Sequence, residues 1–214
     1  MNDLFEDIAR QIIGGESDKV VSLTREALEK GASAEEILNQ GLVSGMDVVG
    51  ERFAAMEMFI PEVLVAAMAM TDGLEILRPL LVAAGIKNDN LLVIGTMEGD
   101  LHDIGQRLVG MIFEGAAFEV INLGADVKPQ NFVDAIKEYN PNLLGMSAML
   151  TTTMVKMDET IKLIESEGLR DSVKIMVGGA PISPDYAEKI GADGYAPNAA
   201  TAVKKAKELL KITQ

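Results

Sequence analysis

The residues that could do chemistry gather in three short stretches, and the first of them holds the chain's only histidine. In the stretch DLHDIG, residues 100–105, His102 stands between Asp100 and Asp103, and Gly105 closes the motif. A neutral imidazole can bind a metal through one ring nitrogen while a carboxylate holds the other, which fixes the tautomer and raises the basicity of the ligand. Asp100 is placed to be that carboxylate, whereas Asp103 suits the cap of a following helix.

The other two stretches are rich in hydroxyl groups and in glycine. SAMLTTT covers residues 147–153, and GGAP covers residues 178–181. Hydroxyl groups could bind the polar part of an organic ligand, and adjacent glycines would leave a slot where side chains otherwise stand. The two glycines could equally form a plain turn at the end of a strand. The chain has no G-x-G-x-x-G or Walker-type loop, so the usual dinucleotide and nucleotide-phosphate sites are not predicted.

Each of the three stretches follows an apolar run that predicts a strand. The predicted strands are residues 90–96, 118–124, 142–148, 173–179 and 192–196. Apolar strands separated by helical patterns indicate a parallel sheet covered on both faces, of the Rossmann or flavodoxin-like kind. Ligands of such folds bind at the carboxyl ends of the strands. We therefore expect the three stretches to converge at one edge of the sheet.

The first part of the chain carries only helical patterns. The predicted helices are residues 2–13, 16–30, 31–56 and 61–81. Ser33 and Glu36 form a capping-box signature at the start of the third helix, and short connections favour a four-helix bundle. The sequence thus predicts an N-terminal four-helix domain at residues 1–88 and a five-stranded α/β domain at residues 89–214, joined by a linker at residues 83–90.

Composition excludes several classes of function. The net charge of -14, from 19 basic and 33 acidic residues, argues against binding to nucleic acid or to anionic membranes. We see no signal-like N-terminus and no apolar stretch long enough to span a bilayer, so the predicted location is the cytoplasm. Without cysteine there can be no disulfide, iron–sulfur cluster or thiolate zinc site. A transition metal would need carboxylate ligands or would arrive inside a cofactor.

Taken together, three motifs resemble the D-x-H-x-x-G, S-x-L and G-G signature of cobalamin-binding proteins. They are Asp100-x-His102-x-x-Gly105, Ser147-x-Met149 and Gly178-Gly179. The stretch GMDVVGERFAAMEMFIPEVLVAAMAM, residues 45–70, resembles the four-helix cap of cobalamin-dependent methionine synthase and of small corrinoid proteins of methyltransferase systems. The likeness covers nearly the whole chain in the same domain order. Met149 departs from the usual leucine, but its similar size and flexibility should preserve the pocket.

The resemblance implies a corrinoid cofactor, cobalamin or a relative, bound base-off with His102 as the lower cobalt ligand. Asp100 and Ser147 would complete a His–Asp–Ser relay whose protonation follows the oxidation state of cobalt. Methyl chemistry would occur at the metal, with no catalytic side chain of the protein. The other residues implied around the corrin ring and its tail are Gly99, Leu101, Asp103, Ile104, Gly105, Met149, Thr151, Gly178, Gly179, Tyr195, Asn198 and Ala199. Those implied above the methyl face are Phe53, Ile60 and Val63.

The same resemblance implies partners, because a carrier cannot complete a reaction alone. A substrate-specific methyltransferase would methylate Co(I), and MSAMLTTTM, residues 146–154, looks most like corrinoid proteins that serve methylamine, betaine and related donors. A second methyltransferase would pass the methyl group to a thiol or a tetrahydrofolate-type acceptor, in methanogenesis or one-carbon metabolism. A reductive activator would restore oxidised cobalt. Motion of the helical cap would need a hinge near residues 83–90.

Other interpretations fit parts of the sequence. From pattern alone, Phe53 and Ile60 would be ordinary core residues of a helix. An adenosylcobalamin isomerase subunit would share the D-x-H-x-x-G loop but would not need a four-helix cap. A cobalamin-dependent gene regulator would also need a DNA-binding module, for which this acidic chain has neither room nor charge. A cofactor-free signalling domain of flavodoxin-like fold would leave the convergence of His102, Ser147 and the two glycines unexplained.

Overall fold

The computed structural model describes residues 1–84 and 90–212. The chain separates into two compact units. One comprises Met1–Asn88 with Glu114–Ala117, and the other comprises Asp89–Phe113 with Phe118–Gln214. Of the predicted linker and hinge at residues 83–90, residues 85–89 lie outside the described part of the chain.

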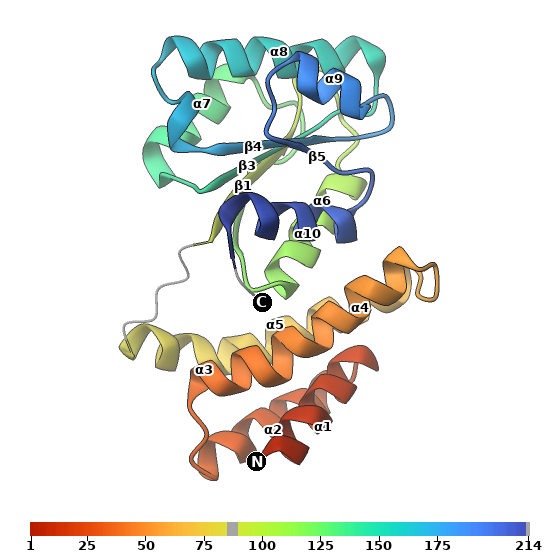
Figure 1. Ribbon diagram of the computed structural model, residues 1–214, viewed down its shortest axis with the longest axis vertical. Coiled ribbons are helices and arrows are strands. Elements are labelled where there is room, and N and C mark those ends of the chain that lie inside the picture. Colours follow the sequence, from red (N-terminus) through yellow and green to blue (C-terminus); the bar gives the residue numbers. More distant parts are fainter. Residues whose placement is uncertain (85–89, 213–214) are drawn as a thin grey trace. The chain divides into compact units, whose positions relative to one another are not determined.

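The first unit is built of helices around an apolar core (Figure 1). They are α1 (Asn2–Ile13), α2 (Ser17–Glu29), α3 (Ala34–Glu36), the π-helix η1 (Ile37–Val43), α4 (Ser44–Ala54) and α5 (Ile60–Ala83). Apolar side chains spaced three and four residues apart, such as Ile8 and Ile12 of α1, are fully buried. The capping box is present: the Ser33 hydroxyl accepts from the Glu36 amide, and the Glu36 carboxylate accepts from the Ser33 amide.

One predicted helix differs from the structure. Residues 31–56 were expected to form a single α-helix, but the chain runs through α3, η1 and α4 in succession. A Cβ added to Gly41 of η1 would lie 3.0 Å from Ile8 Cγ2, and one added to Gly45 would lie 2.8 Å from the Ala9 carbonyl oxygen. The π-helix thus lies next to the part of this segment that packs most closely on α1.

The second unit contains the five parallel strands that the sequence predicted. They are β1 (Leu91–Thr96), β2 (Glu119–Asn122), β3 (Leu143–Ser147), β4 (Lys174–Gly178) and β5 (Gly194–Tyr195). Their order in the sheet is β2-β1-β3-β4-β5. The central strands are almost entirely buried, as expected for parallel strands covered on both faces. The predicted Rossmann or flavodoxin-like fold is confirmed, with the flavodoxin strand order.

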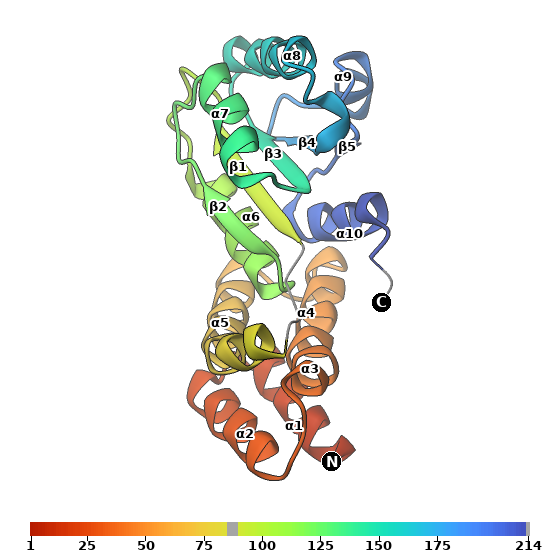
Figure 2. The same ribbon diagram turned by 90° about the vertical axis from the view of Figure 1, so that its left-hand side faces the viewer.

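Helices cover both faces of this sheet (Figures 1 and 2). On one face lie α7 (Pro129–Tyr139), α8 (Thr151–Ser166) and α9 (Pro184–Lys189), and on the other lie α6 (Ile104–Gly115) and α10 (Ala199–Leu210). A short 3-10 turn, η2 (Arg170–Ser172), precedes β4. Buried residues such as Phe132 of α7 and Met157 of α8 pack on Leu144 of β3 in one apolar cluster. Because β1 and β3 are neighbours whose connections leave to opposite sides, a crevice is expected at their carboxyl ends.

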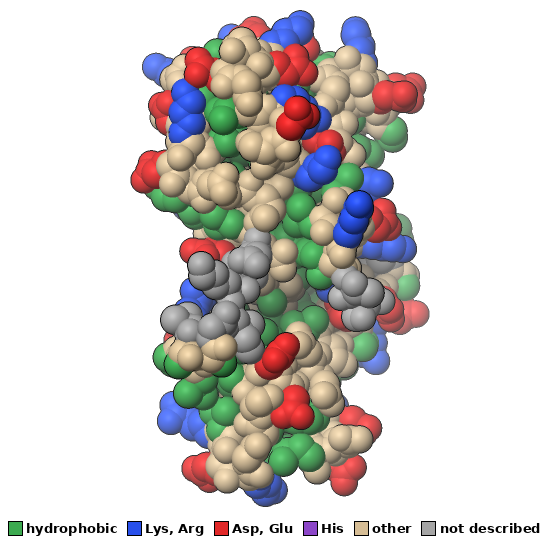
Figure 3. Space-filling view, turned by 60° about the vertical axis from the view of Figure 1, so that its left-hand side comes forward, with side chains coloured by type: hydrophobic (Ala, Val, Ile, Leu, Met, Phe, Trp, Pro, Cys, Tyr) green, Lys and Arg blue, Asp and Glu red, His purple; other side chains and the backbone are tan. Residues whose placement is uncertain are grey.

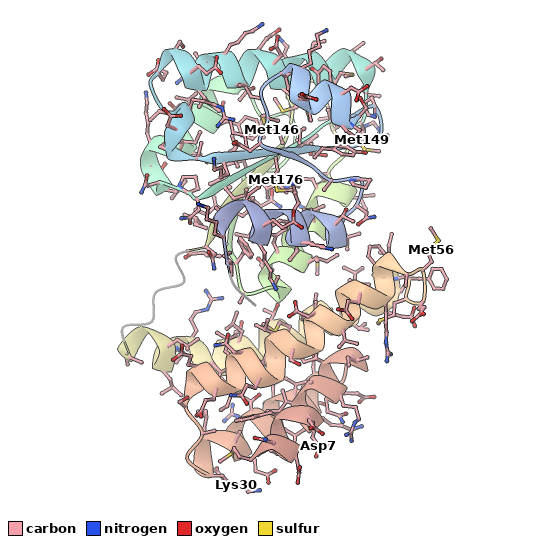
Figure 4. All side chains as sticks on the ribbon, in the orientation of Figure 1. Asp7, Lys30, Met56, Met146, Met149 and Met176 are labelled. Atoms are coloured by element: carbon pink, nitrogen blue, oxygen red, sulfur yellow. The ribbon has the colours of Figure 1, made fainter. Side chains whose placement is uncertain are left out.

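The surface is mixed in character. Figure 3 shows acidic, basic and apolar side chains interspersed on the face that it presents. Met146 and Met176 are buried in the sheet, whereas Met56 is 83% exposed at the end of the α4 segment (Figure 4). Among the described residues, none of the helices has the length and apolarity that a membrane span requires.

The end of β4 is closed by a contact that only glycine permits. Gly179 has φ +121°, and a Cβ on it would overlap the carbonyl oxygen of Ala148, which follows β3. The Ala148 amide in turn donates to the Gly178 carbonyl at 3.2 Å. Gly191 provides a comparison, because it has φ +77° but no atom within 4 Å of an added Cβ.

We predict that Gly179→Ala is far more damaging than Gly191→Ala. Both substitutions place a side chain at positive φ, which costs about 1–2 kcal/mol, but only the first also forces Cβ into a neighbouring backbone. Urea unfolding should show a loss of more than about 3 kcal/mol for Gly179→Ala and the smaller loss for Gly191→Ala. Equal losses would show that the contact with Ala148 is not limiting.

Candidate functional site

A tight turn at residues 97–100 follows β1 and precedes the histidine. The Asp100 amide donates to the Met97 carbonyl at 3.0 Å, and Gly99 adopts φ +83°, a left-handed conformation that favours glycine. The Thr96 hydroxyl donates to the His102 carbonyl at 3.3 Å, which ties the far end of the turn back to the strand. Asp100 is buried at this turn, whereas the His102 side chain is exposed just before α6 begins.

The carboxylate of Asp100 is completely buried and is surrounded by donors. Its Oδ1 atom lies 2.7 Å from His102 Nδ1 and accepts from the His102 amide at 3.1 Å. Its Oδ2 atom accepts from the Met149 amide at 2.7 Å and from the Thr153 hydroxyl at 2.8 Å. One side chain thus joins the loop after β1, the loop after β3 and the first turn of α8.

These hydrogen bonds decide the ionisation of Asp100. Burial by itself raises the pKa of the carboxyl, because an apolar setting disfavours charge. The donors at Met149, His102 and Thr153 outweigh burial and lower the pKa from 3.8 to about 2. Asp100 is therefore an anion at neutral pH, held by charge-assisted hydrogen bonds.

An ionised Asp100 also determines how His102 presents its ring. A carboxylate can only accept, so in the neutral imidazole the proton resides on Nδ1 and the lone pair is on Nε2. The His102 side chain is 60% exposed, and within the described residues only its Nδ1 nitrogen has a hydrogen-bond partner. The arrangement thus offers one oriented nitrogen lone pair to a ligand outside the protein, which is the chemistry of an axial metal ligand.

The structure corrects the third member of the predicted relay. Ser147 ends β3, where its carbonyl accepts from the Met97 amide at 2.9 Å, but its hydroxyl is not a partner of Asp100. Thr153 takes that place, because the first turn of α8 points its side chain back toward the strand ends. The hydrogen-bonded chain is therefore His102–Asp100–Thr153 rather than one that ends in Ser147.

A helical spacing in the sequence could have identified Thr153. Three consecutive threonines open α8 and offer the same hydroxyl chemistry. Only Thr153 is in phase with Met157, Thr160 and Ile164, which all face the sheet and are buried. Period-3.6 reasoning applied to α8 would thus have separated Thr153 from its neighbours.

Exposed apolar side chains lie on the two loops that meet at Asp100. Leu101 and Ile104 are 77% and 84% exposed, and Met149 and Leu150 are each 41% exposed on the neighbouring loop. Large apolar residues this exposed and this close together mark a surface that binds something. At Gly105 an added Cβ would meet no atom within 4 Å, so the space above the start of α6 is open. A flat apolar ring over His102 fits this surface.

The remaining predicted residues of the sheet unit take varied positions. Gly178 ends β4 beside Ser147 in the sheet register, and Thr151 is exposed at the start of α8. Tyr195 packs partly buried against the core. Asn198 caps α10, where its side chain accepts from the Thr201 amide at 3.0 Å. Ala199 is buried. Gly99 and Asp103 belong to residues 97–103, the loop between β1 and α6 that carries His102 and is called the histidine loop here; Asp103 pairs with Arg107 at 3.1 Å. Their roles toward a cofactor stay predictions.

Three predicted residues belong to the helical unit. Phe53 is half-buried near the end of α4, and Ile60 begins α5 and is exposed. Val63 is buried, one turn further along α5, so packing accounts for it without any ligand. The proposed contact of these side chains with a methyl face stays a prediction.

Comparison with known proteins gives a consistent result. Residues 90–204 match the family model of a B12 binding domain, and residues 4–78 match a second model of a B12 binding domain. The dimethylamine corrinoid protein of Methanosarcina barkeri is 45% identical over 211 residues, which cover 97% of this chain and 98% of the relative.

Two solved structures are also similar. A cobalamin-binding protein from Desulfitobacterium hafniense is 31% identical with a TM-score of 0.82, and the match covers 96% of this chain and 98% of that one. A chain of the methanol:cobalamin methyltransferase complex from Methanosarcina barkeri is 29% identical with a TM-score of 0.86, over 99% of this chain and 81% of that one.

We predict that Thr153→Val weakens the acid-dependent part of the protein's stability. In the wild type, the lowered pKa of Asp100 stabilises the fold above about pH 4, and about 2 kcal/mol of unfolding free energy should be lost as the pH falls toward 2. Valine removes one donor, so the pKa of Asp100 should rise and less stability should be lost over this range. At neutral pH the variant should be less stable by about 1–3 kcal/mol.

Thr153→Ser is the matched control, since it keeps the hydroxyl. Urea unfolding of the three proteins between pH 7 and about pH 2 measures the free energy of unfolding at each pH. The difference between a variant and the wild type isolates the effect at Asp100, because distant carboxylates titrate alike in all three proteins. Identical pH profiles for the wild type and Thr153→Val would contradict the assignment of Thr153 as a partner of Asp100.

Proposed function

Because the chain belongs to the family of B12-binding corrinoid proteins, we propose that it carries methyl groups from a methylamine, with dimethylamine the first candidate, to a second methyltransferase. Its cofactor is a corrinoid. The observation that carries the proposal is the His102–Asp100 pair, which directs one imidazole nitrogen out of the protein in the middle of an exposed apolar surface.

The residues around His102 fit a corrinoid ring. When bound, the corrinoid supplies a cobalt centre that can take up a methyl group from one molecule and give it to another. His102 would hold the cobalt through Nε2, because Nδ1 is held by Asp100. Leu101, Ile104 and Met149 would cover the apolar face of the ring and exclude water from it.

The pair of Asp100 and His102 can also hold a proton. Nδ1 keeps its proton in the neutral ring, and a second proton on Nε2 would remove the lone pair that a metal needs. The ionised, buried Asp100 carboxylate stabilises such an imidazolium at a distance of 2.7 Å. Nε2 is thus the atom at which His102 would hold the cobalt.

Identity over the whole chain supports the choice of methyl donor. The relative from Methanosarcina barkeri is a dimethylamine corrinoid protein, and its match to this chain extends over both units. A carrier meets its substrate only through a partner enzyme, so donor specificity resides in the surface that the partner recognises. Similarity over nearly the full length of the chain therefore favours a dimethylamine-specific methyltransferase as partner over one for betaine or methanol.

Two further partners follow from the proposed cycle. A second methyltransferase would move the methyl group to a thiol or a tetrahydrofolate-type acceptor. A reductive activator would return oxidised cobalt to the state that accepts methyl groups. Both are inferred from the requirements of a carrier and from the resemblance of the sequence to corrinoid proteins.

We predict that His102→Ala keeps the corrinoid but loses its protein ligand. After reconstitution with hydroxocobalamin and desalting under anaerobic conditions, the wild type should retain about one corrinoid with a base-off, imidazole-ligated absorption spectrum. The variant should show the spectrum of a corrinoid without imidazole, because no other histidine exists in the chain. Added free imidazole should restore the ligated spectrum.

Either of two results would contradict this ligand assignment. A colourless wild-type protein would mean that the apolar surface around His102 does not hold a corrinoid. An identical spectrum for the wild type and His102→Ala would mean that the corrinoid binds with another lower ligand.

We predict that dimethylamine is the preferred methyl source. The reconstituted, reduced protein should gain methyl groups at least about tenfold faster from dimethylamine with a dimethylamine-specific methyltransferase than from betaine or methanol with their own methyltransferases. A tenfold ratio corresponds to about 1.4 kcal/mol of discrimination at the protein–protein interface. Formation of monomethylamine and the change in the visible spectrum measure the transfer. A faster reaction with the methanol or betaine enzyme would assign the carrier to that donor instead.

A further inference from the structure

The loop that holds His102 has a second attachment, on the side of β2. The segment after β2, residues 124–127, runs beside the end of β1 and extends the parallel pairing of the two strands. The Thr96 amide donates to the Gly124 carbonyl, and the Val127 amide donates to the Thr96 carbonyl, both at 2.9 Å. Met97 and Val127 form an isolated parallel bridge. The loop is therefore anchored from two directions.

Asp126, in this segment, forms two hydrogen bonds to the histidine loop. Its amide donates to the Asp100 carbonyl at 3.1 Å, and its Oδ1 atom accepts from the Gly99 amide at 2.7 Å. The two hydrogen bonds thus hold the 98–99 and 100–101 peptide groups, one on each side of the Gly99–Asp100 pair. A reciprocal pair of this kind fixes the backbone direction at Asp100.

The backbone of Asp126 itself is strained. Its φ is +56°, a left-handed conformation that most residues with a side chain avoid and that asparagine and aspartate tolerate best. Its side chain is exposed and forms no part of the apolar core. The position therefore combines a conformational cost with a specific pair of hydrogen bonds to the histidine loop, which packing alone does not require.

We propose that Asp126 is a positioning residue for His102, acting through the backbone of Gly99 and Asp100. This inference rests on the proposed role of His102 as a ligand. Met149 and Thr153 hold the side chain of Asp100 from the β3 side, and Asp126 holds its backbone from the β2 side. His102 makes its two hydrogen bonds to Asp100 Oδ1 only two residues further on. Without the Asp126 carboxylate, the Gly99 amide loses its acceptor. The peptides around Asp100 can then rotate while the Asp100 carboxylate stays anchored, which weakens the hydrogen bond to His102 Nδ1.

Three substitutions separate the acceptor from the backbone strain. Asp126→Asn keeps a carbonyl oxygen for the Gly99 amide and tolerates positive φ. Asp126→Gly tolerates positive φ but has no acceptor, and Asp126→Ala has neither advantage. Asn140→Ala is the matched control: Asn140 also has a left-handed backbone, with φ +49°, but it follows α7, and within the described residues it has no hydrogen bond to the histidine loop.

The histidine ring of the cofactor-free, full-length protein provides the readout. With ¹⁵N-histidine labelling, the couplings between ring protons and nitrogens report the ratio of the Nδ1–H to the Nε2–H tautomer, and the single histidine gives a single set of signals. Asp126→Gly and Asp126→Ala should lower this ratio about three- to tenfold, as expected for the loss of one hydrogen bond. Asp126→Asn should stay near the wild-type ratio, and Asn140→Ala should not change it.

Two outcomes would overturn the proposal. One is an unchanged tautomer ratio in Asp126→Gly and Asp126→Ala. The other is a loss in Asp126→Asn or Asn140→Ala as large as that in Asp126→Gly, because charge or general stability would then explain the effect. Thermal unfolding of all variants measures their general loss of stability separately.

Reconstitution with hydroxocobalamin separates this proposal from the proposed function. If Asp126→Gly alters the tautomer ratio, the positioning role stands whether or not the protein binds a corrinoid. If the wild type binds one, Asp126→Gly should also lower the ratio of imidazole-ligated to unligated corrinoid by a similar three- to tenfold factor. An unchanged ligation ratio in the loaded variant would confine the role of Asp126 to the free protein and overturn its relevance to cobalt.

Discussion

The structure depends on a buried negative charge, the carboxylate of Asp100. Removing a carboxylate from water costs several kcal/mol unless donors replace the water, and here the main-chain and side-chain donors come from the histidine loop, the loop after β3 and the start of α8. Each segment must be in place for the charge to stay buried. In return, the charge determines which nitrogen of His102 carries a proton and which one faces outward.

The sheet supplies the geometry for this arrangement. β1 and β3 are adjacent and parallel, so the loops that leave their carboxyl ends meet at one edge. The loop after β2 contributes Asp126 from the other side, and Gly179 brings the end of β4 against Ala148. The same burial that stabilises the central strands thus assembles segments that are far apart in the sequence into a rigid support for one exposed imidazole.

Features that depend on local or periodic sequence patterns could be predicted. Features that depend on contacts between segments distant in the sequence could not. Apolar runs identified the five strands, and the runs are clearest in β1 and β3, which are buried on both faces; Ser33 revealed its capping box because that motif is local. The π-helix that contains Gly41 packs closely on α1, a contact between segments that are distant in the sequence. Ser147 and Thr153 offer the same hydroxyl, and only the packing of α8 decides which one meets Asp100. Asp126 carries no sequence signal that links it to a loop 26 residues earlier.

The most direct test of the account is electron paramagnetic resonance of the corrinoid-loaded protein in its Co(II) state, prepared with and without ¹⁵N-histidine. Because the chain has a single histidine, the isotope labels only one candidate ligand. Ligation by His102 predicts that the nitrogen splitting of the cobalt signal changes from a triplet in the ¹⁴N protein to a doublet in the ¹⁵N protein. A triplet that persists after labelling would come from the cofactor's own base and would contradict the assignment of His102 as the cobalt ligand.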